Sequence, residues 1–135
     1  MTGKVTGIGG VFFKARDPEA LAAWYREHLG MPDQGWPGCA FDWREPDTMA
    51  RRGMTIWAPH AQDTDYFAPS QAPFMINYRV DDLEALVAKL EAAGLAVERQ
   101  KESDPNGKFA WLMDPEGNKI ELWEPLAEAP SGETT

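Results

Sequence analysis

A unit of strand, aspartate and helix occurs twice in this chain, and it constrains the fold more than any other feature. The first copy runs from GIGGVFFKA through Asp17 and Pro18 into ALAAWYREHLG, and the second runs from FMINYRV through Asp81 and Asp82 into LEALVAKLEAAG. Asp17 can cap the first helix with Pro18 at its first position, while Asp81 and Glu84 have the spacing of a capping box. The repetition predicts two modules of similar architecture.

Short apolar segments follow each predicted helix. CAFDW and MTIWA come after the first, and LAVERQ, KFAWLM and KIELWE come after the second. In the last segment, alternation places Ile120 and Leu122 on one strand face and Glu121 with Trp123 on the other. The turn DPEGN joins the final two segments into a hairpin. The predicted element order is βαβββ followed by βαβββ.

With these elements in this order, the chain resembles the vicinal oxygen chelate superfamily, which includes glyoxalases, bleomycin resistance proteins and extradiol dioxygenases. The segments DPEALAAWYREHLGM, YRVDDLEALVAKLEAAG and DPEGNKIELWEP carry the resemblance, which covers residues 7–125. It implies an α+β fold whose tandem βαβββ modules form a curved, cup-like mixed sheet. We expect one domain over residues 1–125, with modules at about 7–60 and 74–125, a linker at about 61–73 and a flexible tail at 126–135.

The resemblance also raises the question of a metal site. Metal-dependent members of the superfamily hold a divalent ion with His, Gln or Glu side chains from the first and last strands of each module. In this sequence those positions fall at Gly10, at Met75 and at Thr55 or Trp57, so Glu121 is the only matching ligand. One carboxylate cannot hold Zn²⁺, Mg²⁺, Mn²⁺ or Ni²⁺ without further donors. We therefore expect no standard metal site and no cofactor, and the alternative is a divalent metal on non-standard ligands.

The two histidines do not change this expectation. His28 falls in the last turn of the first helix, where an imidazole stabilises the helix end, and His60 falls in a predicted loop. Their positions lack the paired spacing of a metal motif.

Alternation along the strands predicts an aromatic surface around Glu121. If the curved sheet has the implied inner face, the candidate ligand-binding residues on it are Phe12, Thr55, Trp57, Met75, Asn77, Arg79 and Trp123. Mostly apolar walls with a few polar groups are typical of small-molecule pockets, although the same side chains could simply fill the cup. Glu121 could act there as a catalytic base, or it could pair with Arg79 or Lys14 in a structural role.

Three functional hypotheses follow. The first is a protein that binds a small organic molecule in an aromatic cup without the standard metal, as the resemblance to bleomycin resistance proteins implies. The second is a glyoxalase-class lyase or isomerase, or a dioxygenase-like enzyme, that uses Glu121 with a divalent metal on non-standard ligands. The third is a non-catalytic interaction module. The sequence does not decide whether the protein is an enzyme.

Composition limits the partners. A formal net charge of −9 argues against nucleic acid and against anionic membrane surfaces, since both require clustered Lys and Arg. The sequence has no apolar run near the ~20 residues that span a bilayer, and its start lacks the apolar core of a signal peptide. Cys39 is the only cysteine, so no internal disulfide can form. We expect a cytoplasmic protein and, by the resemblance, a homodimer.

Overall fold

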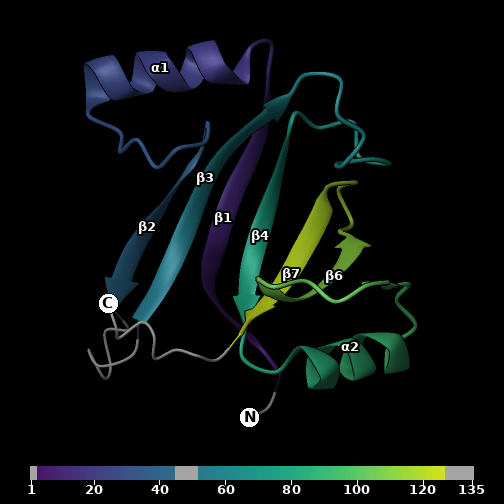
Figure 1. Ribbon diagram of the computed structural model, residues 1–135. Coiled ribbons are helices and arrows are strands. Elements are labelled where there is room, and N and C mark those ends of the chain that lie inside the picture. Colours follow the sequence, from purple (N-terminus) through teal and green to yellow (C-terminus); the bar gives the residue numbers. More distant parts are fainter. Residues whose placement is uncertain (1–2, 45–51, 127–135) are drawn as a thin grey trace.

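A computed structural model describes residues 3–44 and 52–126, which form one curved, seven-stranded mixed sheet with two helices (Figure 1). The elements are β1 (Val5–Ala15), α1 (Pro18–Leu29), β2 (Cys39–Arg44), β3 (Arg52–Ala61), β4 (Phe74–Val80), α2 (Leu83–Ala92), β5 (Glu98–Arg99), β6 (Gly107–Met113) and β7 (Lys119–Pro125). The α+β class and the cup-like sheet predicted from the sequence are therefore confirmed. Most of the predicted tail, 126–135, lies outside the described residues.

The first strand of each module lies at the centre of the sheet. The strand order is β2-β3-β1-β4-β7-β6-β5, and β1 pairs antiparallel with β4. Each central strand pairs in parallel with the last strand of its own module, β1 with β3 and β4 with β7. The two modules therefore meet along the β1–β4 pair and form one continuous sheet.

The helices begin and end largely where capping chemistry predicts. Asp17 accepts a hydrogen bond from the main-chain N–H of Ala20, and Gly30 takes the left-handed conformation after α1. At α2 the predicted cap was wrong by one residue, because Asp82 is the N-cap and accepts from the N–H of Ala85. The carboxylate of Asp81 instead accepts from the N–H of Lys4 at 2.9 Å, which ties the start of β1 to α2.

The strands differ more from prediction. Among residues 3–44 and 52–126, two strands follow α1 and three follow α2, so the first module there has the order βαββ. LAVERQ yields only the two-residue strand β5. In contrast, β3 continues to Ala61 and includes His60, which was predicted to lie in a loop. Pairing with β1 extends this strand, since Lys14 lies opposite His60 in the parallel register.

One face of the second module is closed by α2. Val80, Leu83, Val87, Ala110 and Leu122 form a buried apolar cluster between this helix and strands β4, β6 and β7. Because strand side chains alternate, the opposite face of the same strands carries the neighbouring residues. Asn77, Glu121 and Trp123 are buried there, away from α2, as the alternation in KIELWE predicted.

None of the helices in the described part of the chain is long and apolar enough to cross a membrane.

Candidate functional site

Glu121 is the centre of the site. It lies on β7, opposite Asn77 of β4 and opposite Trp111 of β6, and it is 1% exposed. Its carboxylate accepts hydrogen bonds from Asn77 Nδ2 at 2.7 Å, from Trp111 Nε1 at 2.9 Å and from the hydroxyl of Tyr66. A buried carboxylate is costly unless hydrogen bonds replace its hydration, and these three donors do so.

Tyr66 reaches Glu121 from the connection between β3 and β4. We call residues 62–73 the Tyr66 loop; in Figure 1 this teal connection lies at the end of the sheet where β7 begins. Lys119 Nζ donates to the main-chain oxygen of Tyr66 at 2.8 Å and lies over the rings of Tyr66 and Trp111. Phe67 is fully buried beneath Lys14 and against His60. The loop is therefore anchored in the cup by two neighbouring aromatic residues.

Electrostatics keeps Tyr66 and His60 neutral. Burial raises the pKa of the Tyr66 phenol strongly, and the adjacent Glu121 raises it further. The imidazole of His60 lies parallel to the Tyr66 ring, with the centroids 6.0 Å apart, and tilted against Phe12 at 5.4 Å. Burial lowers the pKa of His60, and the charge of Glu121 only partly opposes this shift. The polar centre thus consists of the Glu121 side chain among neutral donors and rings.

A second aromatic group lines the cup beside this centre. The guanidinium of Arg79 lies between the rings of Trp43 and Trp123, at 5.3 and 5.6 Å from their centroids. Trp123 Nε1 donates to the main-chain oxygen of Asn106 at 2.8 Å, which fixes the indole, and Phe109 stacks on it. Arginine between indole rings is a stable cation–π arrangement.

Gly9 allows β1 to approach this wall closely. A Cβ atom at Gly9 would lie 2.1 Å from Asn77 Oδ1 and 2.8 Å from the Trp123 ring, so no larger residue fits without a shift. Within the described residues, Asn77 Oδ1 has no hydrogen-bond partner, whereas Nδ2 of the same amide is held by Glu121. Asn77 is therefore oriented by its donor, with its acceptor directed at the strand.

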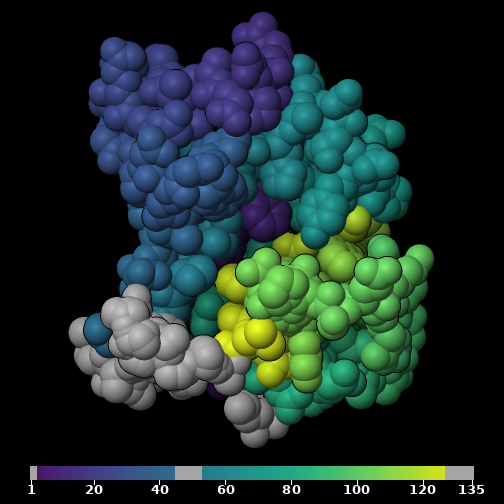
Figure 2. Space-filling view, in the orientation of Figure 1, coloured from purple at the N-terminus to yellow at the C-terminus, as the bar shows by residue number. Residues whose placement is uncertain are grey.

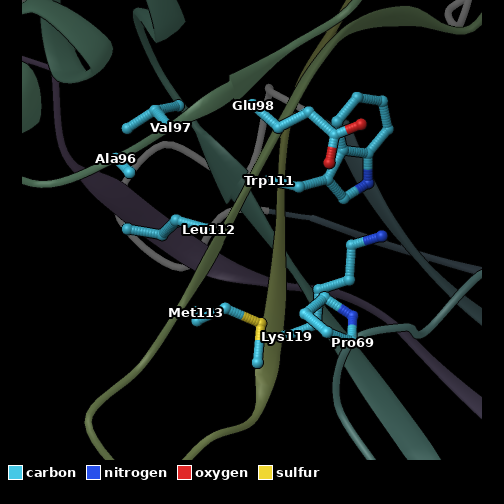
Figure 3. Close-up of a pocket in the computed structure, with 8 residues that line it drawn as sticks. All are labelled: Pro69, Ala96, Val97, Glu98, Trp111, Leu112, Met113 and Lys119. Atoms are coloured by element: carbon cyan, nitrogen blue, oxygen red, sulfur yellow. The ribbon is translucent and has the colours of Figure 1, made fainter.

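Figure 2 shows a hollow between the blue first module and the green and yellow second module, with purple atoms of β1 at its floor. A separate groove of about 300 Å³ lies beside Trp111 at the β5 edge (Figure 3). Its lining residues are Pro69, Ala96, Val97, Glu98, Trp111, Leu112, Met113 and Lys119. Because Trp111 and Lys119 also contact Tyr66, and Pro69 belongs to the Tyr66 loop, the groove opens next to the Glu121 centre.

The structure brings some of the predicted site residues together and separates others. Asn77 contacts Glu121, Arg79 contacts Trp123, and the fully buried Met75 pairs with Phe12 in the β1–β4 register.

Trp57 and Thr55 have other partners. Trp57 packs between Phe13 and Tyr25 of α1, with ring centroids 5.3 and 4.8 Å away. The Thr55 hydroxyl accepts from Trp43 Nε1 and donates to the main-chain oxygen of Ile8. Trp57 thus supports α1, and Thr55 supports the ring that covers Arg79.

The sequence argument missed Tyr66, Trp111 and Ala58. Tyr66 stands in a polar, proline-rich connection, where no periodicity assigns a side chain to a face, although adjacent Tyr and Phe in such a segment are a signal for a packed loop. Trp111 could have been found by alternation, since KFAWLM pairs with KIELWE across a tight turn and Trp111 then falls opposite Glu121.

The register also relates Glu121 to residues of the other central strands. Phe12 and Asn77 stand at equal distances before the two helix caps, Asp17 and Asp82 (17 − 12 = 5 and 82 − 77 = 5). Their parallel partners are Ala58 and Glu121. Gly10 and Met75 also stand at equal distances before the caps (17 − 10 = 7 and 82 − 75 = 7), so the caps do not decide between the two sets. Phe12, Ala58, Asn77 and Glu121 form a second candidate set because Asn77 lies directly opposite Glu121. Phenyl and methyl groups cannot ligate a metal, so these four residues do not fit the superfamily's divalent ion.

The comparisons with known proteins agree with this architecture. A family model described as a glyoxalase-like domain matches residues 10–123. The chain belongs to this glyoxalase-like family, within the vicinal oxygen chelate superfamily. A search of curated proteins finds no match.

Among solved structures, methylmalonyl-CoA epimerase from Mycobacterium tuberculosis is 21% identical, with a TM-score of 0.57, and the alignment covers 97% of this chain and 93% of that one. A Streptomyces coelicolor methylmalonyl-CoA epimerase in complex with 2-nitronate-propionyl-CoA is 16% identical, with a TM-score of 0.64, and covers 90% of this chain and 99% of that one. A catechol 2,3-dioxygenase is 22% identical, with a TM-score of 0.58, over 90% of this chain and 40% of that one. At these identities the likeness shows the fold of the glyoxalase-like chain and not its activity.

Among residues 3–44 and 52–126 there is no group of three or more His, Cys, Asp or Glu side chains placed to hold an ion.

Proposed function

We propose that this glyoxalase-like protein binds a small organic molecule in the cup between its modules, and that it does so without a divalent metal. The residues that the register relates to Glu121 support this most directly. Phe12 and Ala58 offer no donor atoms, and Asn77 directs its amide nitrogen at Glu121. The Glu121 carboxylate is the remaining possible metal ligand, and it already accepts three hydrogen bonds from protein groups.

The chemistry of the walls supports a small apolar or aromatic ligand. Rings of Trp43, Trp111 and Trp123 surround a few oriented polar groups, and the adjoining groove has a volume of about 300 Å³. Mostly apolar walls with sparse, fixed polar groups are typical of small-molecule sites.

The enzyme hypothesis receives less support. A general base must reach the proton that it removes, but Glu121 is nearly fully buried and accepts three hydrogen bonds. Two of those donors, Asn77 and Trp111, are fixed on strands of the sheet. The third is the side chain of Tyr66, which extends from its loop to the carboxylate. Proton abstraction by Glu121 therefore first requires the phenol of Tyr66 to leave.

Calorimetric titration of the chelator-treated protein with indole, quinoline and naphthalene derivatives tests the proposal. We expect at least one compound to bind at one per chain in EDTA, with weaker binding to Phe12→Ala. The matched control is Phe41→Ala, because Phe41 lies exposed on the edge strand β2. Elemental analysis after incubation with Ni²⁺, Zn²⁺, Mn²⁺ and Fe²⁺ should find no metal retained at one per chain. Binding that requires a retained metal would overturn the proposal.

A further inference from the structure

The side chain of Tyr66 occupies the cup as a bound phenol would. Its hydroxyl is hydrogen-bonded to the Glu121 carboxylate. Its ring lies parallel to the His60 imidazole, edge-on to Trp111 at 84°, and beneath the ammonium group of Lys119. The phenol of Tyr66 thus has one hydrogen-bond acceptor and three contacts with rings or a cation. Together these contacts define a site for a hydroxylated aromatic ring.

Tyr66 can leave this position without unfolding the loop. Its side chain is supplied by an irregular connection, and the residue is 36% exposed, so one side of it borders solvent. The adjacent Phe67 is fully buried and holds the loop against His60 and Lys14. Rotation of one tyrosine side chain would therefore open the position while Phe67 remains in place.

The groove of Figure 3 gives a replacement ligand room to extend. It is lined by Trp111, Lys119 and Pro69, all of which lie next to Tyr66 in space or in the loop. Its other walls are mainly aliphatic, with Ala96, Val97 and Leu112. A ring at the Tyr66 position could thus carry an apolar substituent into the groove.

We propose that the ligands of this cup are phenol-bearing molecules, which displace Tyr66 and donate their hydroxyl to Glu121. This inference rests on the proposed binding function and names its ligand class. When Tyr66 leaves, Glu121 loses one of its donors in a buried environment, so an incoming ligand without a hydroxyl would leave the carboxylate undersatisfied. A phenol restores the bond, whereas its methyl ether cannot.

The first experiment uses 4-methylphenol, which has the structure of a tyrosine side chain, and the Tyr66→Ala variant. Calorimetry should show that Tyr66→Ala binds one 4-methylphenol per chain. This variant should bind 4-methylphenol at least about tenfold more tightly than wild type does, and at least about tenfold more tightly than it binds 4-methylanisole, as expected for a hydrogen bond to a charged acceptor. The matched control is Tyr25→Ala, because Tyr25 lies on α1 and packs against Trp24 and Trp57 away from the cup. Equal affinity for the phenol and its ether, or equal gain in Tyr25→Ala, would overturn the inference.

In a second experiment the titration uses the wild-type sequence, and a variant serves only to assign a signal. The chain has three tyrosines, so incorporation of 3-fluorotyrosine gives three ¹⁹F signals, and Tyr66→Phe identifies the one from Tyr66. Titration of the labelled protein with 4-methylphenol should move this signal towards the solvent-exposed position and leave those of Tyr25 and Tyr78 unchanged. No movement at saturating 4-methylphenol would refute displacement. If 4-methylphenol fails while an indole or quinoline compound still binds, the ligand class is wrong and the binding function stands.

Discussion

A single carboxylate, Glu121, connects three parts of the chain that are far apart in sequence. Asn77, Trp111 and Tyr66 come from two strands and a loop, and each donates to it. Glu121 therefore aligns these three donors in the fold, and under the proposed binding function its chemistry as an acceptor would select the ligand.

Replacement of Glu121 by Gln should lower the free energy of unfolding by about 1–3 kcal/mol. A glutamine has one acceptor oxygen, and its NH₂ group would face one of the groups that now donate a hydrogen bond to the carboxylate. Chemical denaturation at neutral pH measures the change. The control Glu116→Gln, in the exposed hairpin turn, should be nearly neutral. Equal stability of Glu121→Gln and wild type would show that the network contributes nothing.

The lowered pKa of His60 predicts a stability that depends on pH. In the unfolded chain the imidazole has a pKa near 6.5, and in the folded chain burial lowers it, so the unfolded state binds more protons between the two values. The contribution of neutral His60 to the free energy of unfolding is fully present above about pH 6.5 and is lost as the pH falls towards the pKa of His60 in the folded chain. Denaturation at about pH 7.5 and about pH 5.5 should show a smaller difference for His60→Gln than for wild type. His28→Gln, at the exposed end of α1, should behave like wild type.

At the scale of elements, the sequence did not predict the strand register, that is, which residues of neighbouring strands lie opposite one another. Caps and alternation predicted both helices and the faces of β7, because these signals are local. The partners of β1 depend on where two distant strands pair, so the sequence did not predict that Gly10 and Phe12 lie opposite Asn77 and Met75. Nor did it predict that Asn77 lies opposite Glu121. The position of Tyr66 depends on packing of an irregular loop, which no local pattern encodes. The fold was thus largely predictable, and the site only in part.

The register makes a constructive prediction. The double variant Phe12→His and Asn77→His should gain binding of Zn²⁺ or Ni²⁺, because two imidazoles would join Glu121 on the same face, and three protein ligands with water suffice for zinc. Elemental analysis should find about one metal per chain in this variant. In the control, Phe13→His replaces Phe12→His and places the imidazole against Trp57. Metal retained equally by both would show that the assigned positions are wrong.

On the scale of the whole molecule, exposed apolar side chains gather on the first module. Trp24, Leu29, Trp36 and Phe41 are each more than 40% exposed, on α1, on the connection after it and on the edge strand β2. Such surfaces are commonly covered by a partner. We predict a homodimer through this part of the molecule.

Light scattering during size-exclusion chromatography tests this prediction. Wild type should have the mass of a dimer, and Phe41→Glu should shift the mass towards the monomer because it places a charge on the edge strand. Leu95→Glu, at a comparably exposed position of the second module, serves as the control and should remain dimeric. A monomeric wild type would contradict the prediction directly.

The hydrogen bond between Tyr66 and Glu121 also has a kinetic consequence. If the phenol must rotate out before a ligand enters, the observed association rate should stop rising with ligand concentration and level off at the opening rate of the side chain. Stopped-flow mixing with 4-methylphenol should show this plateau for wild type and a linear dependence for Tyr66→Ala. Tyr66 would therefore compete with the ligand for its position, and the opening rate of its side chain would also set the maximum rate of ligand association.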